Sequence, residues 1–193
     1  GLLRIHDVDD GEVDLEMQLG PCVGGTASGA VVNSPGLPHM LLVTEGADQL
    51  AAIDLDSGEI RWRRSIPSDD QGVRRGHTRL RRAGKLVIIT DSSHDLCALD
   101  LLSGEVVWRQ RAGECFRHGV TLDGVDLFAV TTNGARGAAT LHRYEPWTGA
   151  ELWRAPLPQD YRVKTPVSFH HLPRKVPHIL IADIPPRQGE ERP

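Results

Sequence analysis

The apolar positions of this chain recur in short alternating runs, which are typical of β-strands. Four strong runs fall at residues 39–46, 85–92, 125–132 and 178–185. A weaker extended stretch precedes each of them, near residues 30–33, 77–82, 118–122 and 166–170. No segment keeps the 3.6-residue apolar period of an amphipathic helix. The pattern therefore predicts an all-β fold with almost no helix.

An internal repeat organises these runs. Residues 50–64 (LAAIDLDSGEIRWRR), 96–110 (LCALDLLSGEVVWRQ) and 141–155 (LHRYEPWTGAELWRA) align without gaps, and a degraded copy occupies 3–17 (LRIHDVDDGEVDLEM). Their glycines are Gly11, Gly58, Gly104 and Gly149, which lie 47, 46 and 45 residues apart. Four short strands in a period of this length predict the four-stranded blade of a β-propeller.

Each full copy is expected to be a hairpin with one large aromatic side chain. The turn glycines Gly58, Gly104 and Gly149 can supply a positive φ, and Trp62, Trp108 and Trp153 each follow their glycine by four residues. One small sheet cannot bury an indole alone, so each tryptophan is predicted to dock on a neighbouring blade. In the degraded copy, Leu15 takes the tryptophan position.

The repeats define one expected domain over residues 1–185, with a disordered tail at 186–193. The chain starts with the last two strands of one repeat and stops after the first two strands of another. Either the two half-blades at its ends pair and close a ring of about four blades, or the chain is an arc of a larger propeller. The arc is the favoured alternative. An arc exposes unpaired blade edges, and these predict self-association.

The pattern L-x-A-[IL]-D-x-x-[ST]-G-E-x-x-W-[RK] resembles the pyrroloquinoline-quinone (PQQ)-type repeat of β-propellers. The copies at 50–64 and 96–110 match it well, and the copy at 141–155 matches moderately. The resemblance implies the blade fold but no single function, because the family includes quinoprotein dehydrogenases and the propeller lipoprotein of the outer-membrane β-barrel assembly machinery. It also favours a bacterial periplasmic or cell-surface location.

A fragment of a PQQ-dependent dehydrogenase is one alternative function. The resemblance implies that members which bind the quinone have adjacent cysteines, a tryptophan floor and a calcium ion. The cysteines here, Cys22, Cys97 and Cys115, are far apart, and the regular tryptophans are explained by docking. We therefore expect no quinone cofactor and no catalytic residue.

The acidic residues of the first copy suggest a possible calcium site. Asp7, Asp9, Asp10 and Asp14 resemble an FG-GAP calcium loop that is one residue short. Calcium binding by these four carboxylates would make the chain a calcium-stabilised adhesion-type propeller. The alternative is an ordinary polar hairpin turn, because Asp7 has the register of Asp54 and Asp100.

The net charge, the arginines and an aromatic residue in a turn indicate which class of partner the chain binds. The net charge of −4 argues against nucleic acid, and no apolar run is long enough to span a membrane. Trp147, in a turn, is either an anchor for a partner or packed over its own turn. Arg74 and Arg75, with the arginines at 79–82, are either a contact for an acidic or phosphorylated partner or a solvated stretch. The favoured function is a non-catalytic scaffold or binding module for a protein or peptide partner.

Overall fold

The structure of the chain is a computed structural model whose described residues form β-strands and their connections. It describes residues 2–7, 9–19, 29–45, 49–66, 79–90, 95–112, 116, 119–123, 125–133, 138–158, 168–171 and 177–180. Within these ranges there are three four-stranded antiparallel sheets and two two-stranded ones, and no helix. The all-β propeller fold predicted from the repeat is confirmed.

The strands follow the predicted repeat closely. The leading hairpin is β1 (Leu2–His6) and β2 (Val13–Gln18). The first complete sheet is β3 (Gly29–Val32), β4 (Met40–Glu45), β5 (Gln49–Asp54) and β6 (Ile60–Ser65). The second is β7 (Arg79–Ala83), β8 (Leu86–Thr90), β9 (Asp95–Asp100) and β10 (Val106–Arg111). The third is β11 (Val120–Asp123), β12 (Asp126–Thr132), β13 (Ala139–Tyr144) and β14 (Glu151–Pro156), and the trailing hairpin is β15 (Ser168–His171) and β16 (Pro177–Leu180).

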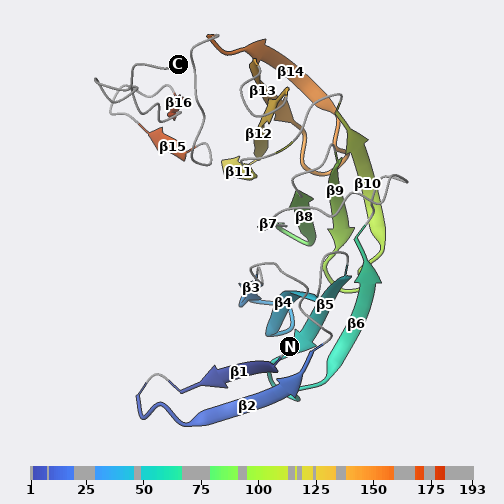
Figure 1. Cartoon of the computed structure of the whole chain (residues 1–193), viewed down its shortest axis with the longest axis vertical. Coiled ribbons are helices and arrows are strands. Elements are labelled where there is room, and N and C mark those ends of the chain that lie inside the picture. Colours follow the sequence, from blue (N-terminus) through green and yellow to red (C-terminus); the bar gives the residue numbers. More distant parts are fainter. Residues whose placement is uncertain are drawn as a thin grey trace, which may run out of the picture.

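The sheets succeed one another along an open arc (Figure 1). In each complete sheet the strands are hydrogen-bonded in chain order, so the topology is a simple meander. The first strands, β3, β7 and β11, lie on the concave side of the arc, and the last strands, β6, β10 and β14, lie on its convex side (Figure 1). The leading and trailing hairpins form separate sheets at the two ends of the arc (Figure 1).

The turn between the last two strands of each sheet is built by a side chain. Asp54 Oδ1 accepts hydrogen bonds from the amides of Asp56 (2.9 Å) and Ser57 (3.0 Å). Asp100 repeats this with the amides of Leu102 (3.0 Å) and Ser103 (2.8 Å). The hydrogen bond from the Ser57 amide, together with a smaller effect of the Arg61 guanidinium, holds the pKa of Asp54 below its usual value.

The hydrophobic core is divided among the spaces between successive sheets. Leu3, Leu15 and Met17 of the leading hairpin pack against Val43, Ala51 and Ile53. Leu42, Leu50 and Trp62 of the first complete sheet pack with Val87, Ile89 and Leu99 of the second. Ile88, Leu96 and Trp108 of the second pack with Leu127, Ala129 and Tyr144 of the third. The inner strands of the complete sheets are therefore buried by the sheets beside them, as a repeat array requires.

Two further predictions from the sequence concern the C-terminal tail and membrane spans. The tail at 186–193 lies outside the described residues. In the described part of the chain, no helix has the length and apolar character needed to cross a membrane.

Candidate functional site

The contact between the first two complete sheets centres on Trp62. Its Nε1–H donates a hydrogen bond of 3.0 Å to the carbonyl of Leu101 in the next sheet. The ring lies over the turn at Gly104, where an added Cβ would be 2.7 Å from Cδ2 of the indole. Gly104 has a φ of +71°, so the turn needs glycine both for its backbone conformation and for the ring above it.

The same contact recurs one sheet further along. Trp108 Nε1–H donates to the carbonyl of Pro146 (2.8 Å), and an added Cβ at Gly149 would be 2.6 Å from its ring. In the degraded first copy the shorter Leu15 takes the place of the tryptophan over Gly58. A Cβ added at Gly58 would be 2.9 Å from Cδ1 of Leu15. In these three contacts, the docking side chain meets the turn of the next repeat along the chain.

Trp153 differs from the other two tryptophans, and its docking on a neighbouring blade stays a prediction. It is 37% exposed, whereas Trp62 and Trp108 are buried. Its ring is tilted against Phe128 of its own sheet, with centroids 6.1 Å apart. Among the glycines that the structure describes, none lies beneath it. The reason is positional: the described residues place no further turn over this ring.

The third complete sheet departs from the repeat at the positions that face the preceding sheet. These positions hold Ala51 and Ile53 in the first complete sheet and Cys97 and Leu99 in the second, all of them buried. In the third sheet they hold His142 and Tyr144, which are also buried, His142 with 5% exposure. The interface between the second and third sheets therefore contains polar groups where the interface before it is apolar. We call the two the polar interface and the apolar interface.

His142 is held from both ring nitrogens. Nε2 lies 2.8 Å from Oγ1 of Thr131, and Nδ1 lies 3.3 Å from Oε1 of Glu151. Because a carboxylate can only accept, Nδ1 carries the hydrogen toward Glu151, and in the neutral ring Nε2 accepts from the Thr131 hydroxyl. Tyr144 stacks on the imidazole, with centroids 5.7 Å apart and planes within 10°. Burial in this interface raises the pKa of the Tyr144 phenol, and the Glu151 carboxylate adds to the increase.

A pocket of about 580 Å³ opens beside these groups. Its walls come from the end of β10 and from β12, β13 and β14 of the next sheet. Two arginines, Arg111 and Arg154, line it together with His142, Tyr144 and Glu151. Arg154 also lies 3.8 Å from Glu151 and is largely exposed. The pocket therefore offers two guanidinium groups and one carboxylate around a fixed imidazole.

Three groups beside this pocket form a hydrogen-bonded series. A hydroxyl, an imidazole and a carboxylate in series are the parts of a nucleophilic triad. Thr131, however, has 0% exposure, and its hydroxyl is already bonded to His142. The hydrogen-bond series instead fixes the orientation of the imidazole and holds Glu151 in the pocket wall.

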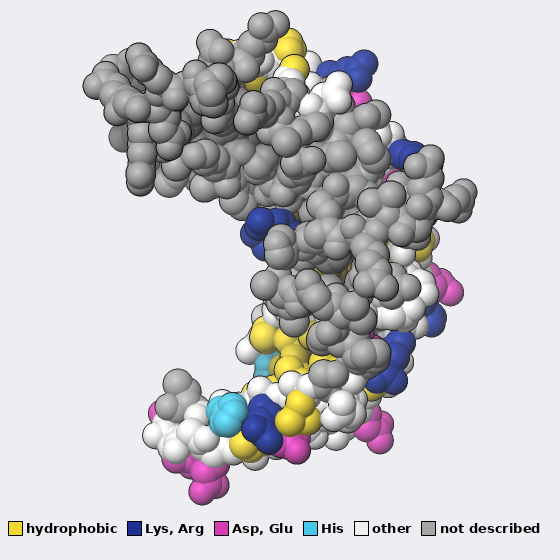
Figure 2. Space-filling view, in the orientation of Figure 1, with side chains coloured by type: hydrophobic (Ala, Val, Ile, Leu, Met, Phe, Trp, Pro, Cys, Tyr) yellow, Lys and Arg dark blue, Asp and Glu magenta, His cyan; other side chains and the backbone are white. Residues whose placement is uncertain are grey.

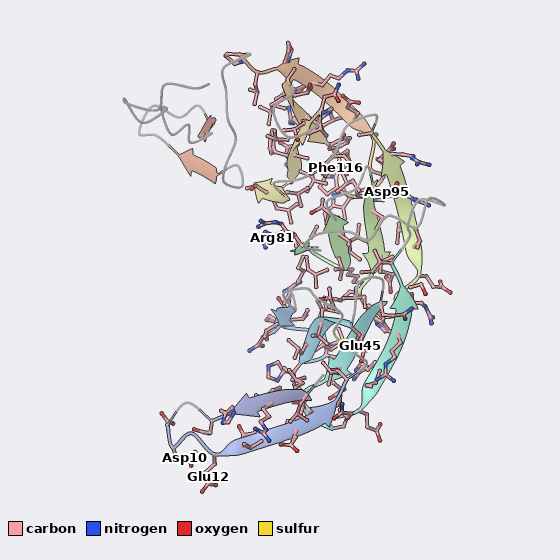
Figure 3. All side chains as sticks on the ribbon, in the orientation of Figure 1. Asp10, Glu12, Glu45, Arg81, Asp95 and Phe116 are labelled. Carbon is pink, nitrogen blue, oxygen red and sulfur yellow. The ribbon has the colours of Figure 1, made fainter. Side chains whose placement is uncertain are left out.

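The four aspartates of the leading hairpin are not gathered around one point. Asp7 Oδ1 accepts from the amide of Asp9 (2.6 Å), and Asp10 Oδ1 accepts from the amide of Glu12 (2.8 Å). These are turn-forming bonds, and Asp10 and Glu12 lie at the outer tip of the hairpin (Figure 3). No three His, Cys, Asp or Glu side chains of the described residues converge on a metal position, Asp14 included. Calcium binding here stays a prediction.

The residues predicted to contact a partner are only partly described. Arg74 and Arg75 lie outside the described residues. Of the neighbouring arginines, Arg81 lies on the concave side of the arc (Figure 3), and Arg82 donates to Ser34 Oγ (3.0 Å) of the first complete sheet. Trp147 is 48% exposed and packs on the turn at Gly84 in the preceding sheet, neither on its own turn nor fully in solvent.

Trp62 and Trp108 do not fit the tryptophan floor of a quinone site. Trp62 and Trp108 lie in different interfaces, and each indole N–H is used by a backbone carbonyl of the next sheet. They cannot together form a floor for one planar cofactor. The sequence also lacks adjacent cysteines.

Sequence reasoning missed the pocket residues Thr131, His142, Tyr144 and Glu151. A signal was present in the repeat, because the copy at 141–155 has His142 and Tyr144 where the other full copies have small or aliphatic residues. Such a departure marks a position whose side chain no longer serves only to pack one sheet against the next.

Comparisons with known proteins agree with the fold. A family model described as outer membrane protein assembly factor BamB matches residues 4–114 and 95–168. The structure of BamB from Moraxella catarrhalis is similar, with a TM-score of 0.53 and 18% identity over 75% of this chain and 40% of that chain. No curated protein matches the sequence closely enough to count as a relative.

Quinoprotein enzymes share the same architecture. A europium-containing methanol dehydrogenase has a TM-score of 0.53 and 18% identity over 70% of this chain and 27% of its own. Quinohemoprotein alcohol dehydrogenase ADHIIG from Pseudomonas putida HK5 has a TM-score of 0.51 and 16% identity over 72% and 24%. The chain thus spans less than half the length of these proteins, and identities this low show the fold alone.

Proposed function

From the premise that this chain belongs to the PQQ-like β-propeller family whose model is described as outer membrane protein assembly factor BamB, we propose that it is a non-catalytic binding module for a protein partner. The partner would present an extended segment at the polar interface, with a carboxylate side chain entering the pocket beside His142. The observation that carries this proposal is the concentration of polar residues at one interface of an otherwise repetitive array.

The repeat itself supports a binding role. The recurring residues are used in construction: the aspartates form turns, the glycines admit the indoles, and Trp62 and Trp108 join the sheets. Residues that depart from this pattern are free of that constraint. In the described part of the chain such departures include His142 and Tyr144, which line the same pocket.

The charges around the pocket favour an acidic side chain. Arg111 and Arg154 outnumber Glu151 along its walls, although the whole chain has a net charge of −4. A guanidinium binds a carboxylate through paired N–H donors, which gives direction as well as attraction. The Glu151–His142 bond keeps the wall carboxylate partly engaged, so that an incoming acid meets less repulsion.

Binding of matched peptides tests this function. Short labelled peptides with one glutamate in a neutral extended sequence are compared, by fluorescence anisotropy, with twins in which that residue is glutamine. We expect the glutamate peptides that bind to do so about tenfold more tightly, as a charge-assisted hydrogen bond contributes about 1.5–3 kcal/mol. Arg154→Gln should abolish the preference, whereas Arg64→Gln on β6, an exposed arginine distant from the pocket, should leave it unchanged.

Two results would count against the proposal. Equal affinity for the glutamate and glutamine peptides, or a preference that survives Arg154→Gln, would exclude the pocket as the binding site. Tight binding of PQQ in the presence of calcium, with dye-linked oxidation of alcohols or sugars, would favour a dehydrogenase fragment instead.

A further inference from the structure

The first strand of the second complete sheet is strongly basic. Three of its five residues are arginines, Arg79, Arg81 and Arg82, whereas the first strands of the other two complete sheets, GAVV and VTLD, contain no basic residue. Arg81 is exposed, and Arg79 and Arg82 are half-buried. Figure 2 shows basic side chains at the middle of the concave side of the arc, where Figure 3 labels Arg81. We call these three residues the β7 arginine surface.

The sheets on either side of β7 hold two of these side chains in place. β7 lies between β3 of the first complete sheet and β11 of the third. Arg79 extends toward the start of β11, where a Cβ added at Gly119 would be 2.6 Å from its Cδ. Arg82 reaches the other way, because its Nη2 donates to Ser34 Oγ (3.0 Å) and its Nε donates to the Gly84 carbonyl (3.0 Å). Side chains that are already ordered lose less conformational entropy when a ligand binds.

The positive charge of this surface is not neutralised within the described part of the chain. Among the residues described, no carboxylate forms an ion pair with any of its three arginines. Arg81 Nη1 donates only to a neutral acceptor, the carbonyl of Leu80 (3.0 Å). By contrast, Arg63 on β6 binds the buried carboxylate of Glu45. The β7 arginine surface can therefore bind an anion from outside without first breaking an ion pair.

The spacing of the arginines along β7 indicates how the acidic groups of a ligand would be arranged. Arg79 and Arg81 are two residues apart in a strand that pairs with β8 without a bulge, so they leave the same face about 7 Å apart. Alternate side chains of any other extended chain have the same spacing. Arg4 and Glu16 show such a pairing in this chain, since they lie directly opposite each other on β1 and β2 and form an ion pair of 2.7 Å.

We propose that the β7 arginine surface binds an extended acidic segment of a partner protein, with carboxylates at alternate residues paired to Arg79 and Arg81. A guanidinium gives each carboxylate paired N–H donors. The net charge of −4 favours a short segment with two acids over a long polyanion such as nucleic acid, which would meet repulsion beyond this surface. This second site goes beyond the function proposed above, because the pocket beside His142 is lined by other residues.

Two peptides of equal composition and charge test the predicted spacing. One contains Glu-Thr-Glu and the other Glu-Glu-Thr, each in the same neutral extended sequence with a fluorescent label. Because adjacent side chains of an extended chain point to opposite faces, the second peptide can engage only one of the two arginines at a time. By fluorescence anisotropy at low ionic strength, we expect the alternating peptide to bind at least about fivefold more tightly. Equal affinities would overturn the proposal.

A matched pair of variants tests the location. Arg81→Gln should lower the affinity for the alternating peptide to that for its isomer. Arg64→Gln is the control and should leave the preference unchanged. Arg64 is also exposed and its Nη1 also donates to the preceding carbonyl (3.1 Å), but it lies on β6, on the convex side of the arc (Figure 1). Equal losses in the two variants would show a general effect of charge and would contradict binding at β7.

Competition by small anions tests the chemistry of the site. We expect glutarate, a dicarboxylate, to displace the alternating peptide at least as well as inorganic phosphate at equal ionic strength. Displacement by phosphate at concentrations where glutarate has no effect would show a phosphate site instead, and would overturn the proposal. The preference for spacing depends on Arg81, whereas the preference for a single glutamate at the pocket depends on Arg154. Either result can therefore fail while the other holds.

Discussion

The apolar and polar interfaces are made from the same repeat and solve the same packing problem differently. Both are joined by a tryptophan that donates to a carbonyl and covers a turn glycine. Beyond that shared contact, the apolar interface buries Cys97 and Leu99, while the polar interface buries His142 and Tyr144. The difference teaches that the docking tryptophan holds the sheets together, so that the remaining positions can change their chemistry.

The arrangement of charged groups separates the third complete sheet from the first two. In the first two, buried carboxylates are paired with arginines of the outer strands, as in Glu45–Arg63 (2.8 Å) and Asp95–Arg109 (2.7 Å). Figure 3 labels both acids, well separated along the arc. At the polar interface, Glu151 instead turns toward His142 and the pocket. Figure 2 shows other acidic side chains in solvent along the convex side of the arc and at the tip of the leading hairpin.

Removing a docking ring should have the largest effect on the comparison. Trp62→Ala and Trp108→Ala are each expected to lower the free energy of unfolding by about 3–5 kcal/mol, because each deletes a buried indole and its hydrogen bond. Trp153→Ala should cost less than about 2 kcal/mol, since that ring is 37% exposed. Urea unfolding at low protein concentration measures all three. Similar losses for Trp108 and Trp153 would contradict the docking model.

Exchanging the polar residue between the interfaces should have the next largest effect. Cys97→His places an imidazole among Val87, Ile89 and Leu99, and we expect a loss of about 2–4 kcal/mol from overpacking and burial of a polar ring. The reverse change, His142→Cys, should cost about 1–2 kcal/mol, because Thr131 and Glu151 lose a partner. If Cys97→His were the milder change, the apolar interface would not be specified as described.

Two turn glycines separate the cost of the ring from the cost of the backbone. Gly104→Ala and Gly11→Ala both place a side chain at a positive φ, but of these two only Gly104 lies beneath an indole. We expect Gly104→Ala to be more destabilising than Gly11→Ala by about 1–3 kcal/mol in thermal or urea unfolding. Equal losses would mean that the indole adds no constraint on the turn beneath it.

Alkaline titration gives the smallest expected effect and is specific to the polar interface. Burial raises the pKa of the Tyr144 phenol in the folded chain, so the folded state keeps its proton where the unfolded state loses it. The associated stability is fully present below about pH 10 and is lost as the pH rises above that value. Tyr144→Phe should therefore flatten the fall in the unfolding midpoint above about pH 10. An unchanged slope would place the phenol in solvent.

The predictable part of the molecule is the part that repeats. Four aligned copies were enough to place the strands and the turns, because hairpin geometry depends on local residues such as Asp100 and Gly104. Spacing also placed Trp62 and Trp108 on strands that need a neighbour. It did not show that these two rings cover the next turn glycine, because that contact joins residues that are distant in sequence and depends on how successive sheets are placed in space.

The pocket, the exposure of Trp153 and the bonding of the leading aspartates could not be predicted in the same way. His142, Thr131 and Glu151 come from three different strands, and only the strand register brings them onto one face. Trp153 looks equivalent to Trp108 in the sequence, but the burial of each ring depends on whether another turn covers it in space. The aspartates of the leading hairpin resembled ligands, yet Asp7 and Asp10 are engaged by turn amides.

The contact from an indole to the next turn points the same way along the chain in both interfaces. Duplication of one repeat unit in a gene would therefore copy both a donor ring and an acceptor turn. The added sheet would make the same contact with the sheets on either side, without any change to them. Proteins built on this rule can lengthen or shorten by whole units during evolution. They can then diversify one joint at a time while the others preserve the frame.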